Sequence, residues 1–244
     1  MLNGSIGFAA GVKGNGFTFP KFEYNPNVAN VVKAEIEGQD GRSIRCTVHL
    51  TNVPSEENGQ KLAWSVFDSA LNRIAYYQEA SISNECVTGV SFIPVDGNKG
   101  VVTVSLQMSW NVEASVVKAV TEASLKPQLE QAATLGEVNF GMFRSALNST
   151  GPVEAFMSLY HILLVLFADE QKCVDSFILS KEPDVQQTVH PKKAKAGIKE
   201  TIYSRLRNEL AHKRNVDMAK TKKEMVSRLG GLVTITKQAI ELRL

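Results

Sequence analysis

The sequence contains little cysteine and no hydrophobic run long enough to cross a membrane. Its 244 residues include three cysteines, Cys46, Cys86 and Cys173, which form no C-x-x-C pair. This spacing argues against a disulfide framework or a zinc site and favours a reducing cytoplasm. The longest apolar run, Ala155–Ala168, is too short for a membrane span, so we expect a buried helix there and no membrane partner. The first residues, MLNGSIGFAAG, lack the basic region and the long apolar stretch of a signal peptide.

Familiar catalytic and cofactor motifs are missing as well. No two of the four histidines stand at metal-ligand spacing, and no G-x-S-x-G motif occurs. The glycine-rich segment Gly11–Phe17 lacks the Lys-Ser or Lys-Thr of a phosphate-binding loop. We therefore expect no metal and no cofactor. The composition, 43% hydrophobic and 21% charged, is that of a globular protein, and the length allows two domains.

The N-terminal part has the pattern of strands. Apolar and polar residues alternate in Thr18–Tyr24, Val32–Gly38 and Ser43–Val53, and the Asp40-Gly41 step between the last two predicts a hairpin. A second hairpin is expected around residues 96–100. Between the hairpins, apolar residues recur every three to four positions over Glu56–Gln78, which predicts an amphipathic helix. Residues 1–112 are therefore expected to form a small antiparallel sheet with one covering helix, a domain of unknown role.

The C-terminal part has the pattern of helices. We expect helices over residues 113–134, 138–148, 152–168, 170–181, 194–213 and 218–242. Pro152 starts one of them at a position where its missing N–H does no harm. Because most connections are short, the helices should pack antiparallel. The predicted fold class is α+β, with residues 113–244 forming an all-α antiparallel bundle.

The charge is distributed unevenly along this second part. The formal net charge of the chain is only +2. The stretch His190–Arg228, however, contains twelve Lys/Arg and four Asp/Glu, a net of +8, whereas the other residues sum to −6. A basic block on an otherwise acidic chain suggests an anionic partner such as a nucleic acid, although such blocks are often only solvated helix surface.

Within this block, one predicted helix has a polar side that contains an arginine and a histidine. A helical wheel places an apolar stripe on one side: Ile198, Ile202, Leu206 and Leu210. The opposite side carries Glu200, Ser204, Arg207, Asn208, Ala211 and His212. Arg207 and His212 lie about 140° apart on the wheel, with Asn208 and the small Ala211 between them. This arrangement leaves space for a ligand to approach.

The chemistry of these residues suits a phosphodiester. Arg207 is permanently charged and can bind a phosphate through two N–H groups, and His212 can transfer a proton near neutral pH. Such a pair can cleave RNA without a metal, because the ribose 2′-OH is the nucleophile. Five basic residues flank the helix and could hold the RNA backbone: Lys192, Lys193, Lys195, Lys213 and Arg214. The alternative is a solvent-facing Arg and His with no role, since this spacing is common by chance.

The stretch RNELAH, Arg207–His212, resembles the signature of the HEPN superfamily, an arginine followed after four to six residues by a histidine. The helices FMSLYHILLVLF and ETIYSRLRNELAH resemble the paired bundle helices of bacterial HEPN proteins of the MauJ-like and Apea-like groups. The resemblance covers roughly residues 113–244. Many relatives have Gly or another small residue after the histidine, whereas Lys213 and Arg214 follow it here.

The resemblance implies a four- to five-helix bundle, usually dimeric, in which the Arg/His helices of two protomers form a composite cleft. Arg207 would then contact the scissile phosphate, His212 would act as general acid or base, and Asn208 would orient it. Ser204 and Glu200 are added as substrate-binding residues by their position on the wheel alone.

The expected function is therefore RNA handling by a cytoplasmic homodimer, as a metal-independent endoribonuclease that could also have a protein partner such as an antitoxin. The alternative is a non-catalytic HEPN-like binding or assembly module for a protein, RNA or a nucleotide.

Overall fold

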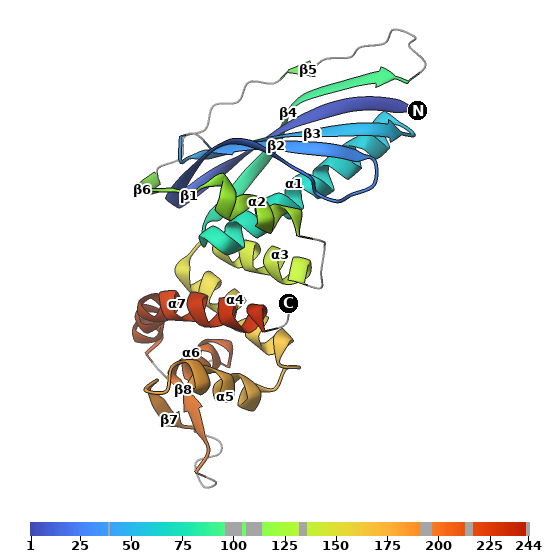
Figure 1. Cartoon of the computed structure of the whole chain (residues 1–244). Helices are drawn as coiled ribbons and strands as arrows, with labels where there is room; N and C mark the ends of the chain where they lie inside the picture. Colours follow the sequence, from blue (N-terminus) through green and yellow to red (C-terminus); the bar gives the residue numbers. More distant parts are fainter. Residues whose placement is uncertain are drawn as a thin grey trace. The chain divides into compact units, whose positions relative to one another are not determined.

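The chain divides into two compact units, which are described separately. The computed structural model describes residues 1–38, 40–95, 104–105, 114–131, 136–190, 197–212 and 217–242. Contacts separate the chain into Met1–Leu147 and Asn148–Leu244. The expected boundary lay at residues 112/113, so helices α2 (Glu122–Glu130) and α3 (Gly136–Leu147) fall in the first unit and not with the C-terminal helices. The chain is of the mixed α+β class (Figure 1).

The first unit is built around the 23-residue strand β1 (Leu2–Tyr24). The sheet has the order β2-β3-β1-β4-β5, and all neighbours on this path are antiparallel. The bounds are β2 (Val31–Gly38), β3 (Ser43–Val53), β4 (Ser81–Pro94) and β5 (Val104–Ser105). A further strand, β6 (Ala114–Ala119), pairs with β1 in parallel. The sheet is thus mixed, whereas a purely antiparallel sheet was expected.

Strand β6 also shortens the first of the expected C-terminal helices. The helix predicted over residues 113–134 begins only at Glu122, because the preceding segment pairs with the middle of β1, Val117 lying opposite Gly16. β-branched residues favour such a pairing. Of the second expected hairpin, the structure describes the pairing of Val90 with Val104, while its turn at residues 96–100 lies outside the described residues.

Helix α1 (Glu56–Gln78) covers one face of the sheet, as its apolar spacing predicts (Figure 1). Ser55 caps its N-terminus by accepting a hydrogen bond from the backbone N–H of Asn58 at 3.2 Å. Its apolar face is buried: Ala63, Val66, Phe67, Ala70, Leu71 and Ile74. The rings of Phe67 and Phe8, on β1, stack with centroids 4.8 Å apart, which joins the helix to the sheet.

Helix α3 belongs to the first unit because aromatic rings join it to α1. The ring centroids of Tyr76 and Phe140 are 4.5 Å apart, and Phe143 makes an edge contact with Tyr76 at 5.4 Å. All three side chains are at least 98% buried. Such contacts connect segments that are far apart in sequence, so they could not be anticipated from the local pattern.

The described residues of the second unit form four helices and a short hairpin. The helices are α4 (Pro152–Leu166), α5 (Gln171–Lys181), α6 (Ile202–Ala211) and α7 (Met218–Glu241). Strands β7 (Gln187–Val189) and β8 (Lys199–Thr201) pair antiparallel, so this unit is not the purely helical bundle that was expected. The helix predicted over residues 194–213 begins only at Ile202, because the backbone of residues 199–201 forms hydrogen bonds to β7.

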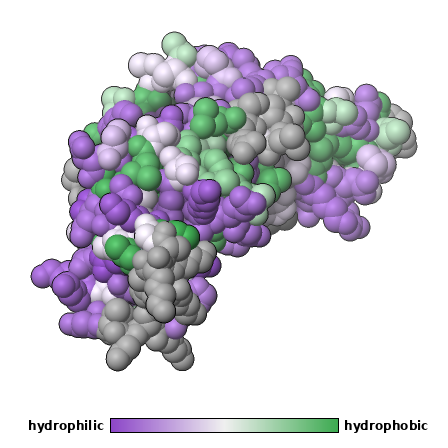
Figure 2. All heavy atoms as spheres, turned by 90° about the horizontal axis from the view of Figure 1, so that it is seen from below, coloured by the Kyte–Doolittle hydropathy of each residue, from purple (hydrophilic) through white to green (hydrophobic). Residues whose placement is uncertain are grey.

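In the described parts of the chain, no single helix is long and apolar enough to cross a membrane. Helices α4 and α5 are long and apolar enough for a membrane span only when they are taken together, and the two helices are bent by 105° relative to one another. Hydrophilic residues occupy much of the face seen in Figure 2, with hydrophobic residues in groups among them.

Candidate functional site around Arg207

Helix α6 starts after the capping residue Thr201 and ends at His212. The side chain of Thr201 caps the N-terminus by accepting a hydrogen bond from the backbone N–H of Ser204 at 3.3 Å. Glu200 therefore lies in β8, one residue before the cap and outside the helix. At the other end, the backbone N–H of His212 donates to the carbonyl oxygen of Asn208 at 3.1 Å. The helix thus places Ser204, Arg207 and Asn208 on its body and His212 at its C-terminal end.

The side of α6 that was expected to face solvent is mostly buried. Ser204, Asn208 and Glu200 expose only 0%, 2% and 1% of their surface. Ile198, expected in the apolar stripe, is 45% exposed. Ile198 and Glu200 precede the helix, so the wheel does not apply to them. For Ser204 and Asn208 the wheel is wrong because it assumes one apolar core, whereas α6 packs on two sides and one of these sides supplies polar partners.

The first polar cluster joins α4, α5 and α6 through Asp175. Its Oδ1 accepts hydrogen bonds from the Thr201 backbone N–H at 3.0 Å, the Thr201 hydroxyl at 2.6 Å and the Ser204 hydroxyl at 2.6 Å. Tyr160 lies 2.6 Å from the Ser204 hydroxyl and donates to it, since Ser204 gives its own hydrogen to Asp175. Burial raises the pKa of Tyr160, so its phenol remains protonated. The carboxylate of Asp175 thereby stabilises the N-terminal end of α6.

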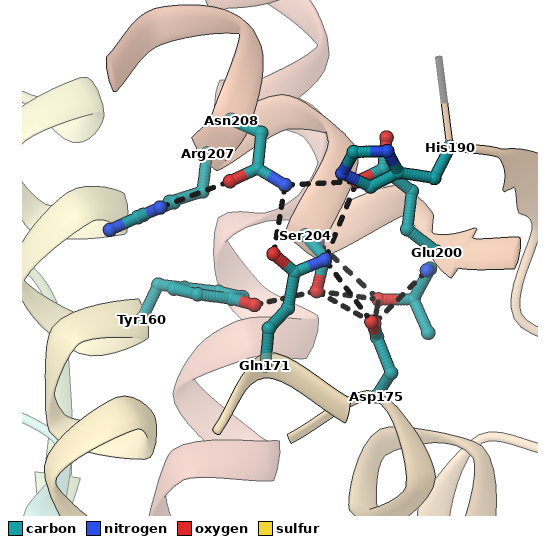
Figure 3. A network of polar contacts seen from close by, with 9 residues as sticks. Tyr160, Gln171, Asp175, His190, Glu200, Ser204, Arg207 and Asn208 are labelled. Atoms are coloured by element: carbon teal, nitrogen blue, oxygen red, sulfur yellow. Dashed lines mark hydrogen bonds and ion pairs between the residues drawn. The ribbon is translucent and has the colours of Figure 1, made fainter. Parts of the chain in front are cut away.

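The second polar cluster surrounds the side-chain amide of Asn208 (Figure 3). Its Nδ2 donates to Gln171 Oε1 at 3.0 Å and to Glu200 Oε2 at 2.9 Å, and its Oδ1 accepts from Arg207 Nη1 at 3.0 Å. The side chain of His190 lies 3.9 Å from Glu200 Oε2, an ion pair when the imidazole is protonated. Both amide hydrogens of Asn208 are therefore committed to other side chains, and its oxygen holds Arg207.

Arg207 is held in place and has hydrogen-bond donors to spare. Its Nη1 donates to Asn208, and its Cζ lies 6.0 Å from the centroid of the Tyr160 ring. The residue is partly buried. Among the described residues, no carboxylate lies within ion-pair distance of Arg207, whereas Arg205 pairs with both Glu209 and Glu224. A guanidinium has five N–H donors, so an anion can bind to those that remain.

The other predicted residues are only partly accounted for by the described structure. His212 is exposed at the end of α6. The basic residues expected to hold RNA lie outside the described residues: Lys192, Lys193, Lys195, Lys213 and Arg214. The described site therefore consists of a positioned arginine and an exposed histidine on one short helix.

Five residues of this site were not anticipated from the sequence: Tyr160, Gln171, Asp175, His190 and Thr201. Gln171 and Asp175 are four residues apart on α5, a spacing that places them on one face of that helix. The spacing of Gln171 and Asp175 could have indicated a polar face on α5. It does not show that this face packs against α6.

Comparisons of the chain with models of known protein families, with curated proteins and with solved structures gave no match.

Proposed function

We propose that the second unit binds RNA and cleaves it without a metal ion, with Arg207 binding the scissile phosphate and His212 transferring a proton. The proposal combines the R-x4-H resemblance with one observation, the held arginine that has no acidic partner among the described residues. Asn208 fixes one side of its guanidinium by a 3.0 Å hydrogen bond. A pre-positioned arginine loses little entropy when it binds a phosphate, which favours recognition of that group.

The proposed reaction is an attack of the ribose 2′-oxygen on the adjacent phosphorus. A bond forms between the 2′-oxygen and phosphorus while the bond from phosphorus to the 5′-oxygen breaks. One histidine accepts the proton of the 2′-OH and another protonates the leaving 5′-oxygen. In a homodimer with a composite cleft, His212 of each copy supplies one of these transfers. The products are a 2′,3′-cyclic phosphate and a 5′-OH.

The burial of the neighbouring polar residues changes the roles that we assign to them. Asn208, Ser204 and Glu200 are committed to hydrogen bonds within the unit. We therefore treat them as positioning residues for Arg207, and not as groups that contact the substrate.

The test is an RNA cleavage assay on the full chain with EDTA present. His212→Ala is expected to lower the rate by about 10²–10⁴-fold, because it removes the proton-transferring group. His161, also exposed and on α4, provides the matched control, and His161→Ala should cleave at the wild-type rate. Equal cleavage by wild type and His212→Ala would rule out the proposed role of His212.

The second candidate function is a non-catalytic module that binds RNA or a partner protein. The observation that favours it is the burial of Ser204, Asn208 and Glu200, three residues expected to serve the substrate. In that case the wild type binds RNA or a second copy without cleaving RNA, and Arg207→Ala weakens binding while His212→Ala does not. A cleaving wild type excludes this alternative.

A further inference from the structure

The first unit contains a cavity that the proposed function does not use. It has a volume of about 500 Å³ and lies among the end of β1, helix α1 and helices α2 and α3. This volume is within the range of small-molecule sites, roughly 300–1,000 Å³. Six apolar residues contribute to its wall: Pro26, Val28, Val66, Ala70, Leu129 and Val138. An apolar wall of this size suits a mainly apolar ligand.

Tyr24 lines this cavity and has a buried hydroxyl with no hydrogen-bond partner among the described residues. The residue is 3% exposed, and its Oη exposes less than 1 Å² and forms no hydrogen bond within the described part of the chain. Buried tyrosine hydroxyls usually have a partner, because an unsatisfied polar group is costly in the interior. Burial raises the pKa of Tyr24, so the hydroxyl keeps the hydrogen that it could donate.

Arg73 contributes a second donor without a partner. Its side chain is 4% exposed; Nη1 donates to the backbone oxygen of Gln128 at 2.6 Å, and Nη2 pairs with Glu137. Its Nε exposes less than 1 Å² and forms no hydrogen bond with any residue that the structure describes. Arg73 also lines the cavity, so two of the lining residues carry a covered donor without a partner among the described residues.

Each acidic residue that lines the cavity is paired with an arginine, which indicates an uncharged ligand. Glu137 is paired with Arg73, and Asp68, the other acidic residue of the wall, is paired with Arg144 at 2.8 Å. A ligand anion would meet these two carboxylates, and a ligand cation would meet Arg73.

We propose that this cavity binds a neutral, largely apolar small molecule with an oxygen that accepts a hydrogen bond from Tyr24. Because the Tyr24 hydroxyl is covered in the structure, binding requires a small rotation of the Tyr24 side chain, as is common when ligands bind. Arg73 stays in place, held by Gln128 and Glu137. Such a site would work independently of the Arg207 helix, which lies in the other unit.

The test is a titration of the full chain with prodan, an uncharged naphthalene ketone whose emission shifts to the blue in apolar surroundings. We expect saturable 1:1 binding with a blue shift. Tyr24→Phe should weaken binding by roughly three- to tenfold, since it removes one hydrogen-bond donor.

A matched pair of glycine variants locates the bound probe. Gly141 lies in the wall, and an added Cβ would meet only Asn72, at 3.5 Å, so Gly141→Leu should fold and fill the cavity. Gly230 is on α7 in the other unit, and an added Cβ there meets nothing within 4 Å. We expect Gly141→Leu to abolish binding and Gly230→Leu to leave it unchanged, with circular dichroism confirming that both are folded. Absence of saturable binding to the wild type, or equal binding to folded Gly141→Leu, would overturn the proposal.

Discussion

Replacing Asn208 with aspartate turns the NH2 group of a buried amide into an oxygen and leaves the shape almost unchanged. In the native chain this group donates to Gln171 and, at 2.9 Å, to Glu200 Oε2. An introduced carboxylate can donate to neither, and it would stand against the carboxylate of Glu200, which is 1% exposed. The contact with Arg207 survives because the other oxygen keeps its place.

The expected loss of stability depends on the repulsion between the introduced carboxylate and Glu200, and on the cost of protonating the introduced carboxyl to remove that repulsion. Two unit charges 2.9 Å apart repel by about 6 kcal/mol at an effective dielectric constant of 20. Protonating a carboxyl with an ordinary pKa of about 3.9 at pH 7 costs about 4 kcal/mol, so the introduced carboxyl would take up a proton before the full repulsion is reached. We therefore expect Asn208→Asp to lower the free energy of unfolding by about 4 kcal/mol at pH 7.

The sign of the pH dependence distinguishes this mechanism from a simple loss of contacts. The folded variant would hold a proton that the unfolded chain releases, so its stability relative to the wild type should rise as pH falls, by about 1.4 kcal/mol per pH unit. At pH 5 the loss should shrink to about 1.5 kcal/mol. Asn208→Ala, which introduces no charge, should show a loss that does not change between pH 5 and pH 7.

The assay is urea unfolding followed by far-ultraviolet circular dichroism at pH 5, 6 and 7 for the wild type and both variants. A loss for Asn208→Asp that stays constant with pH would refute the reasoning, because the carboxylate contact with Glu200 would then be absent. If Asn208→Asp lowered the free energy of unfolding by less than about 1 kcal/mol at pH 7, Asn208 would not be buried against Glu200 as the structure has it.

Two further predictions concern the first unit. Hydrogen bonds from Lys21 and Lys33 lower the pKa of Glu35 from 4.5 to about 2. The ionised carboxylate therefore stabilises the folded state above about pH 4.5, and this contribution is lost as the pH falls toward 2. Glu35→Gln should cost about 1 kcal/mol at pH 7, since its partners are at the surface, and the difference from wild type in acid unfolding should vanish near pH 2. Arg144→Ala should cost about 3–5 kcal/mol in urea unfolding, because Arg144 is 8% exposed and pairs with Asp68 and Glu85. Lys126→Ala, which removes an exposed ion pair, should cost under about 0.5 kcal/mol, and equal losses for these two variants would contradict the account of Arg144.

Local patterns predicted the elements whose determinants are close together in the sequence. The three- to four-residue spacing of apolar side chains predicted α1 because the residues that pack on the sheet, such as Phe67, recur with the period of a helix. The Asp40-Gly41 step predicted the hairpin of β2 and β3, which the structure contains. Gly41 has a positive φ of 70°, whereas Asp40 is not among the described residues with positive φ, so the turn is not of type I′. In both cases a few neighbouring residues decide the backbone.

Features that depend on distant partners could not be predicted in this way. Strand β6 forms through parallel pairing with β1, about a hundred residues earlier in the chain, and nothing in its own short sequence indicates that partner. The burial of Asn208 depends on Gln171, on another helix, and on Glu200, across the start of α6. Because a helical wheel contains no information on what surrounds the helix, it correctly grouped Arg207 with Asn208 but assigned their side to solvent.

The chemical identity of the RNA ends tests the central claim most directly. A pool of RNAs of randomised sequence would be incubated with the full chain in EDTA, and the new ends would be determined by mass spectrometry. The account predicts 2′,3′-cyclic phosphate ends with the wild type and with His161→Ala, and none with His212→Ala. An intact pool, or the same ends with His212→Ala, would contradict it.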